Sequence, residues 1–204
     1  ILISDHASFS WGKFAGEPVH AGDLLPIDFT YQSLDVLAAN VDMVQQNLGR
    51  RILVENLSSY LPSNHSQISE PEFLSKLVER TNCGLIVDLN NLLVNSKNFG
   101  YSNPLNTAKQ WLAEIPMHAV GEFHLAGHSQ VGPDDLIIDD HSQAVSDDCW
   151  DLYRFAINRF GPVISLIEWD NNLPDWHTLL DQAEHAREIL REESCIDMGL
   201  LHEA

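Results

Sequence analysis

The sequence predicts an α/β fold built on a parallel β-sheet, and three observations lead to this prediction. Short apolar runs alternate with stretches of helical pattern along the whole chain. The apolar runs are mostly continuous, which is typical of parallel strands that are covered on both faces. No linker-like break interrupts the alternation, and 204 residues suffice for a sizeable core. We therefore expect a single domain over residues 1–204.

Five apolar runs are the predicted strands, and they lie at residues 2–3, 52–54, 85–87, 120–125 and 163–167. Helix signals separate them. Thr30, Ser69 and Ser146 can each cap a helix, and Gly49 is placed to end the first one. Further helices are expected over residues 104–114 and after Pro174. The order predicts parallel strands joined by right-handed helical crossovers.

Each predicted strand carries a potential metal ligand at or near its C-terminal end. These ligands are His6, Glu55, Asp88, His124 and Glu168. In a (β/α)8 barrel the C-terminal strand ends meet on one face, where active sites are built. An ionised carboxylate is costly to bury there unless it is paired or metal-bound. A single strand-end acid is more often a helix cap, but recurrence at all five strands favours a barrel with a metal site over an open doubly wound sheet.

A later segment adds Asp139 and His141, which would point the same way in an extended chain because they are two residues apart. Asn90 follows Asp88 at the same spacing, and whether Asn90 or His128 binds metal stays open. The set combines imidazole with carboxylate and lacks thiolate, which suits iron, manganese or zinc. One ion needs about three or four protein ligands, so this many candidates predict two or three metals.

Charge and cysteine usage exclude several classes of function. The formal net charge of −19, from 30 acidic and 11 basic residues, argues against binding to nucleic acid or to an anionic membrane. No apolar run approaches the roughly 20 residues of a membrane span, and no signal peptide is visible. The three cysteines form no CxxC pair, so we expect neither a disulfide framework nor a zinc ribbon. This cysteine usage predicts a reduced, cytoplasmic location.

Five segments in the same order closely resemble one family, the multinuclear non-haem iron-dependent oxidative enzymes, formerly domain of unknown function 692 and typified by MbnB of methanobactin biosynthesis. The segments read RRILVENLSSYL, EPEFLSKLVERTNCGLIVDLNNLLVN, VGEFHLAGH, LIIDDH and LIEWDNNLP. The resemblance implies a (β/α)8 barrel similar to xylose isomerase that holds two or three irons. It also implies oxidation, with O2, of cysteines in ribosomally synthesised precursor peptides, often with a partner protein that presents the peptide.

Matched motif by motif, the ligands that the resemblance implies are His6, Glu55, Asp88, Asn90, His124, Asp139, His141 and Glu168. Family members usually have three further strands before the motif with His6, and one of these supplies another histidine ligand. We therefore expect this chain to be the C-terminal five β/α units of the barrel. Five of eight strands leave a sheet with two open edges that expose apolar surface. Three interpretations stay open: the missing strands exist outside this chain, the chain pairs with another copy, or it is a degraded remnant.

Two alternative functions share these features. One is another divalent-metal barrel enzyme of the sugar isomerase type, which would use Mn or Zn in place of iron and would be active without O2. The other is an inactive relative that only binds a peptide or a partner, and that would fail to bind metal stoichiometrically.

Overall fold

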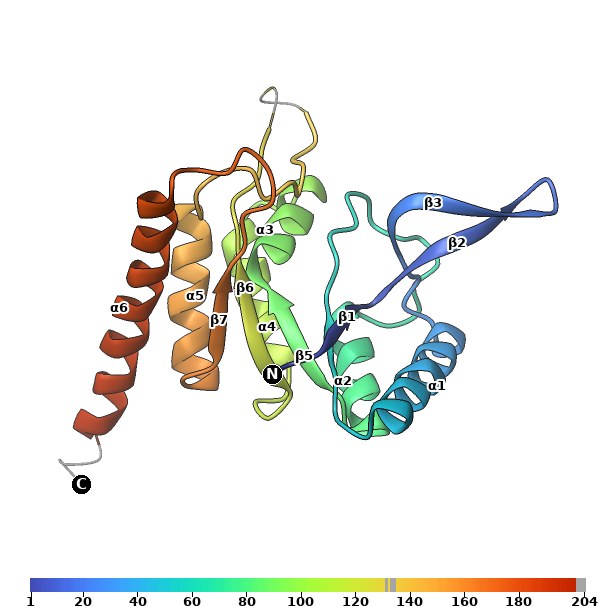
Figure 1. Cartoon of the computed structure of the whole chain (residues 1–204), viewed down its shortest axis with the longest axis horizontal. Helices are drawn as coiled ribbons and strands as arrows, with labels where there is room; N and C mark the ends of the chain where they lie inside the picture. The colour runs from blue at the N-terminus through green and yellow to red at the C-terminus, as the bar shows by residue number, and fades with distance from the viewer. Residues whose placement is uncertain (131, 133–134, 201–204) are drawn as a thin grey trace.

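The computed structural model describes residues 1–130, 132 and 135–200, with side chains up to residue 193. Its centre is a parallel sheet in the order β1-β4-β5-β6-β7 (Figure 1). These strands are β1 (Ser4–His6), β4 (Leu53–Glu55), β5 (Gly84–Asp88), β6 (Val120–Leu125) and β7 (Ile164–Ile167). Every neighbouring pair is parallel, so all five C-terminal ends lie at one end of the sheet.

Six helices accompany the sheet within the described part of the chain: α1 (Tyr31–Leu48), α2 (Glu70–Thr81), α3 (Leu89–Asn98), α4 (Pro104–Glu114), α5 (Asp147–Phe160) and α6 (Trp176–Leu200). Helix α1 packs on α2, α2 on α4, α4 on α5, and α5 on α6. The core between helices and sheet buries large side chains such as Phe73, Leu85, Leu112, Phe123 and Tyr153. Among the described residues, no helix combines the length and the apolar character that a membrane span requires.

The predicted helix starts are confirmed by their capping hydrogen bonds. Thr30 accepts from the backbone N–H of Ser33, and Ser69 accepts from that of Glu72. Ser146 caps α5 in the same way. Each bond satisfies one N–H of a first turn, which has no partner within the helix. Gly49 ends α1 with a left-handed φ of 63°, as predicted.

The predicted burial of the outermost strands is wrong. Leu2 of the first apolar run is exposed, as is Ile1 before it, and β1 begins only at Ser4. Ile164 and Leu166 of β7 are exposed as well. A continuous apolar run predicts burial only if elements cover both faces, and β1 and β7 are edge strands with one neighbour each in the described sheet.

Residues 7–29, for which the sequence pattern predicts no element, contain an antiparallel hairpin. Strands β2 (Ser8–Phe14) and β3 (Glu17–Pro26) are joined by Ala15 and Gly16, both with positive φ. Figure 1 shows the hairpin projecting away from the body of the molecule. Because both of its faces are largely exposed, the signal of one buried face is absent.

Helix α3 was also not predicted, because it follows β5 without a loop. Asp88 ends β5 and is itself the N-cap of α3, accepting from the backbone N–H of Asn91 at 2.7 Å. Cys83 and Cys149 are free and buried, in agreement with the expected absence of a disulfide between them. The side chain of Cys195 lies outside the described residues.

Gly127, just after β6, allows the segment after His141 to pack closely against the chain, because it has no side chain. A methyl group on Gly127 would lie 2.2 Å from the carbonyl oxygen of Ala144 and 2.5 Å from that of Gln143. Backbone atoms cannot give way as the end of a flexible side chain can. Only glycine permits this close approach of the two chain segments.

Gly127→Ala should therefore lower stability by about 1–3 kcal/mol, the range typical of overpacking. Thermal unfolding followed by circular dichroism should show a Tm lower by roughly 2–4 °C for each kcal/mol. Gly12→Ala is the control, because a methyl group there meets nothing within 4 Å. Equal melting temperatures for the two variants would contradict the close approach.

Candidate metal centre

The C-terminal strand ends place charged side chains side by side. His6 is the register partner of Glu55 across β1 and β4, and Asp88 is the partner of His124 across β5 and β6. The backbone N–H of Glu168 donates to the carbonyl oxygen of Leu125 at 3.0 Å, which continues the pairing of β6 and β7. Parallel pairing in this register therefore gathers residues that are far apart in the sequence.

A first group of contacts is centred on His124. Its Nδ1 lies 3.1 Å from Glu55 Oε1 and 3.1 Å from Glu168 Oε2. His6 joins from β1, with Nε2 at 3.5 Å from Glu55 Oε2. Glu55, Asp88 and His124 are buried, whereas His6 is partly open to solvent.

A second group of contacts is centred on His141. Its Nε2 lies 3.0 Å from Asp139 Oδ1 and 3.8 Å from Asp88 Oδ2. Its Nδ1 lies 3.4 Å from Glu168 Oε2 and 3.2 Å from Asp170 Oδ2. Glu168 thus touches both groups and links them.

The backbone at His141 is not extended, so the extended geometry expected for the pair Asp139 and His141 is wrong. His141 has a left-handed φ of 46°, a region that only a few per cent of non-glycine residues adopt. Its carbonyl oxygen accepts from the backbone N–H groups of Asp170 and Asn171 at 2.9 and 3.3 Å. The segment after β7 therefore fixes the turn that brings the imidazole beside Asp139.

Amide side chains support the carboxylates from outside. Asn90 Nδ2 donates to Asp139 Oδ1 at 2.7 Å, and its Oδ1 lies 2.7 Å from His128 Nδ1. Asn90 therefore bridges Asp139 and His128. Asn56 fixes the C-terminal end of β5. Its side chain accepts a hydrogen bond from the backbone N–H of Asp88 and donates one to the carbonyl oxygen of Asp88.

Protonation balances part of the negative charge. Burial raises the pKa of Asp88 to about 8, the carboxylate of Asp139 adds to this, and His141 opposes it. Burial would lower the pKa of His124, but the adjacent carboxylates of Glu168 and Glu55 raise it to about 10. His141 behaves alike: its contacts with Asp139 and Asp88 outweigh burial and raise its pKa to about 9. With these pKa values, both imidazoles are doubly protonated and positively charged at neutral pH.

The donor atoms fit a divalent metal. Asp88 Oδ2, His124 Nδ1 and both ring nitrogens of His141 are buried without a hydrogen bond of acceptable geometry. Single ligand atoms of Glu55, Asp88, His124 and Glu168 lie within 4.8 Å of one another, as do those of His141, Glu168 and Asp170. Buried polar atoms normally have partners, and a cation at each group would supply them. The set of imidazole and carboxylate without thiolate suits iron, manganese or zinc.

Two acidic residues of this region were not among the predicted ligands. Asp170 contacts His141. It lies two residues after Glu168, the same spacing that predicts Asp139 and His141 as a pair, so this spacing could also have identified Asp170. Glu122 lies two residues before His124 on β6 and so shares its face of the sheet. Burial raises the pKa of Glu122, His124 lowers it, and the nearby carboxylates of Glu55 and Glu168 raise it further.

The eight residues selected from the sequence lie in one connected network: His6, Glu55, Asp88, Asn90, His124, Asp139, His141 and Glu168. A family model described as RiPP precursor modification enzyme MbnB/TglH/ChrH matches residues 1–191. The chain belongs to this family. The family predicted from the five sequence motifs is thereby confirmed.

Curated relatives agree with this membership. The chain is 40% identical over 206 residues to a UPF0276 protein of Paraburkholderia phytofirmans, with 100% of the chain and 63% of the relative covered. It is 43% identical over 188 residues to a UPF0276 protein of Chromobacterium violaceum, with 92% and 64% covered. The chain thus spans less than two thirds of the length of these relatives.

A solved structure with a related fold is a xylose isomerase domain containing protein from Salmonella typhimurium. The TM-score is 0.57 at 14% sequence identity, and the match covers 82% of this chain and 61% of the other. At this identity the likeness shows the fold alone. It confirms the predicted class, an α/β fold of the xylose isomerase-like barrel type, of which the described sheet supplies five parallel strands.

Metal binding should release protons, because His124, His141 and Asp88 hold them near neutral pH. The apparent affinity for Mn²⁺ or Zn²⁺ should consequently rise as the pH increases from about 6 to about 8. Calorimetric titration in buffers of different ionisation enthalpy measures the protons released. An affinity that does not change with pH would contradict these residues as the binding groups.

Proposed function

We propose that this chain carries the metal centre of an iron-dependent oxidase that uses O2 to modify cysteine residues of a ribosomally synthesised precursor peptide. The observation that carries the proposal is the carboxylate of Glu168, which belongs to both groups of donor atoms in a chain of a precursor modification family. A shared carboxylate between two such groups is suited to two neighbouring ions. The resemblance to the multinuclear iron enzymes supports iron as the metal.

In this proposal one ion would be held by Glu55, Asp88, His124 and Glu168. A second would be held by His141, Glu168 and Asp170, and Asp139 lies beside His141. Bound iron would supply the redox chemistry with O2, which protein side chains cannot provide. His6 would approach the first ion from β1. Asn90 keeps Asp139 in position through its hydrogen bond.

The protein's own residues set access and charge. Asp88 is fully buried, whereas the side chains of His6 and Asp170 are 39% and 60% exposed. The centre is therefore closed at Asp88, whereas His6 on the edge strand β1 and Asp170 after the edge strand β7 face solvent. Exclusion of water on the closed side strengthens the hold of the carboxylates on a cation.

The partners and setting that we propose follow from this chemistry. The substrate is a precursor peptide, presented by a partner protein, in a cytoplasmic setting where its cysteines stay reduced. The free edges of β1 and β7 are the surfaces through which the sheet could pair with another chain.

The metal content of anaerobically purified protein tests the proposal. We expect about two or more iron ions per chain, since one ion needs about three or four protein ligands. Elemental analysis by mass spectrometry gives the count, and O2 consumption with a cysteine-containing precursor peptide gives the activity. Tightly bound zinc or manganese with activity independent of O2 would favour the sugar isomerase type. No stoichiometric metal would favour a relative that only binds peptide or partner.

Glu168→Gln should remove both ions, because its carboxylate belongs to both groups, whereas Glu55→Gln should affect mainly the ion at His124. A neutral amide is a much weaker ligand for a hard cation than a carboxylate. Glu72→Gln on the exposed side of α2 is the control and should keep the full metal content. Wild-type metal content in Glu168→Gln would refute the shared ligand.

A further inference from the structure

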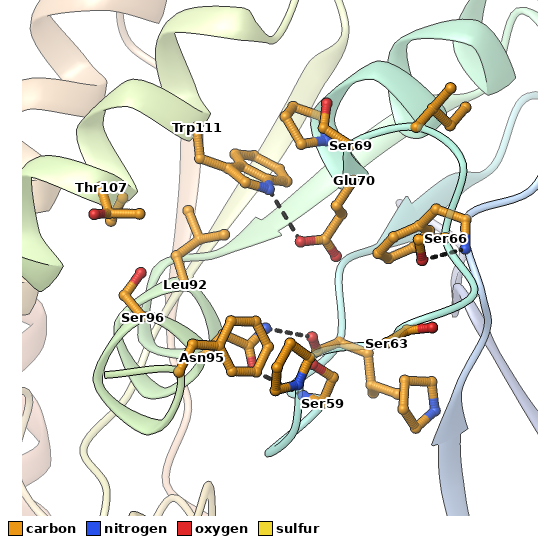
Figure 2. A pocket seen from close by; sticks show the side chains of 18 of the residues that line it. Ser59, Ser63, Ser66, Ser69, Glu70, Leu92, Asn95, Ser96, Thr107 and Trp111 are labelled. Atoms are coloured by element: carbon orange, nitrogen blue, oxygen red, sulfur yellow. Dashed lines mark hydrogen bonds between the residues drawn. The ribbon is translucent and has the colours of Figure 1, made fainter. Parts of the chain in front are cut away.

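A cavity of about 440 Å³ lies outside the metal centre, between the loop that joins β4 to α2 and the helices α3 and α4 (Figure 2). Residues 26–29, just before α1, form another wall. None of the eight predicted metal-site residues lines it. The cavity is large enough for a long side chain of a peptide.

The lining combines apolar surface with negative charge. Phe29, Phe99 and Trp111 contribute aromatic rings, and Asp28, Glu70 and Glu114 contribute carboxylates; the described lining residues include no lysine, arginine or histidine. A ligand that complements such a lining needs an apolar stem and a cationic head. Lysine and arginine side chains have this construction.

Among the carboxylates that line the cavity, that of Glu70 is held in position by a hydrogen bond. Its Oε2 accepts a hydrogen bond from Trp111 Nε1 at 3.0 Å, and Figure 2 shows the two side chains meeting across the cavity. Within the described part of the chain, Glu70 makes no ion pair. Burial raises its pKa to about 7, and the hydrogen bond from Trp111 opposes this rise. A half-buried carboxylate without a counter-ion is costly, and a cationic ligand would remove that cost.

The cavity adjoins the metal centre through shared chain segments. Ala7 and Leu57 line it, and they follow the metal-site residues His6 and Glu55 by one and two positions. Two residues span at most about 7 Å, so this wall begins beside the ligands. Asn95 fixes the wall, because it accepts from the backbone N–H of Ser59 and donates to the carbonyl oxygen of Leu57.

We propose that this cavity is a specificity subsite that takes a lysine or arginine side chain of the peptide substrate, with the cationic head at Glu70 and the stem against Trp111 and Phe29. The inference rests on the proposed function, since it assigns the ligand to the peptide that the metal centre modifies. An extended peptide advances about 3.3 Å per residue, so the basic residue would lie a few positions from the modified cysteine.

The indole N–H of Trp111 offers a local reporter for the test. The full chain is labelled with ¹⁵N-tryptophan, and Trp111→Phe assigns the resonance. It is titrated with a capped pentapeptide that contains one lysine among alanines, and with the same peptide containing leucine instead. We expect a saturable shift with the lysine peptide and binding of the leucine peptide that is weaker by about tenfold or more, a difference of ~1.4 kcal/mol.

Glu70→Gln removes the charge but keeps an oxygen that can accept from Trp111 Nε1. Its affinity for the lysine peptide should fall about tenfold, while that for the leucine peptide stays the same. Unchanged binding of the leucine peptide and an unchanged melting temperature show that the cavity and the fold are intact. The carboxyl of Glu70 is protonated below its pKa, so wild-type affinity for the lysine peptide should rise from about pH 6 to about pH 8. The other titratable groups facing the cavity, Asp28, Tyr101 and Glu114, are unchanged in the variant, which should lose this rise.

Three outcomes would overturn the subsite: no saturable shift with the lysine peptide, equal binding of both peptides, or unaltered affinity in Glu70→Gln. Binding of butylammonium without binding of the lysine peptide would overturn the assignment to a peptide. The titration needs no metal, so its result is separate from the iron content. A protein that purifies anaerobically without iron and yet binds the lysine peptide would contradict the proposed oxidase and leave the cation-binding cavity standing.

Discussion

Asp88 is the constraint on which the surrounding structure depends. Its backbone ends β5, one carboxylate oxygen caps α3, and the other faces His141 inside the molecule. A fully buried carboxylate is tolerated only with compensating partners, and the backbone N–H of Asn91 and the imidazole of His141 supply them. The direct transition from β5 to α3 and the charged cluster therefore depend on the same side chain, that of Asp88.

The loop between β4 and α2 connects the two polar regions of the molecule. It leaves the metal centre at Glu55 and reaches the cavity carboxylate at Glu70, and Asn95 of α3 holds it midway. Tyr60 of this loop also accepts, through its hydroxyl, from the backbone N–H of Asp139 at 3.3 Å. A displacement of this loop would therefore alter both the metal centre and the cavity at Glu70.

The strand-end residues could be predicted from the sequence because parallel topology alone brings the ends of β1, β4, β5, β6 and β7 together. The spacing of two residues predicts Asp139 and His141 as ligands. In the structure, however, it is the left-handed turn at His141 that brings its imidazole beside Asp139. The hairpin could not be predicted by a pattern that relies on one buried face. The cavity could not be predicted either, because its walls come from segments between Ala7 and Glu114 that only the packing of α2, α3 and α4 brings together.

The position of Glu168 between the two groups of donor atoms has a thermodynamic consequence. A cation at either group would fix the rotamer of this carboxylate, so the entropy of ordering it is lost once and not at each binding event. Occupation of one group then favours occupation of the other. This entropic contribution acts against the Coulomb repulsion between two neighbouring cations.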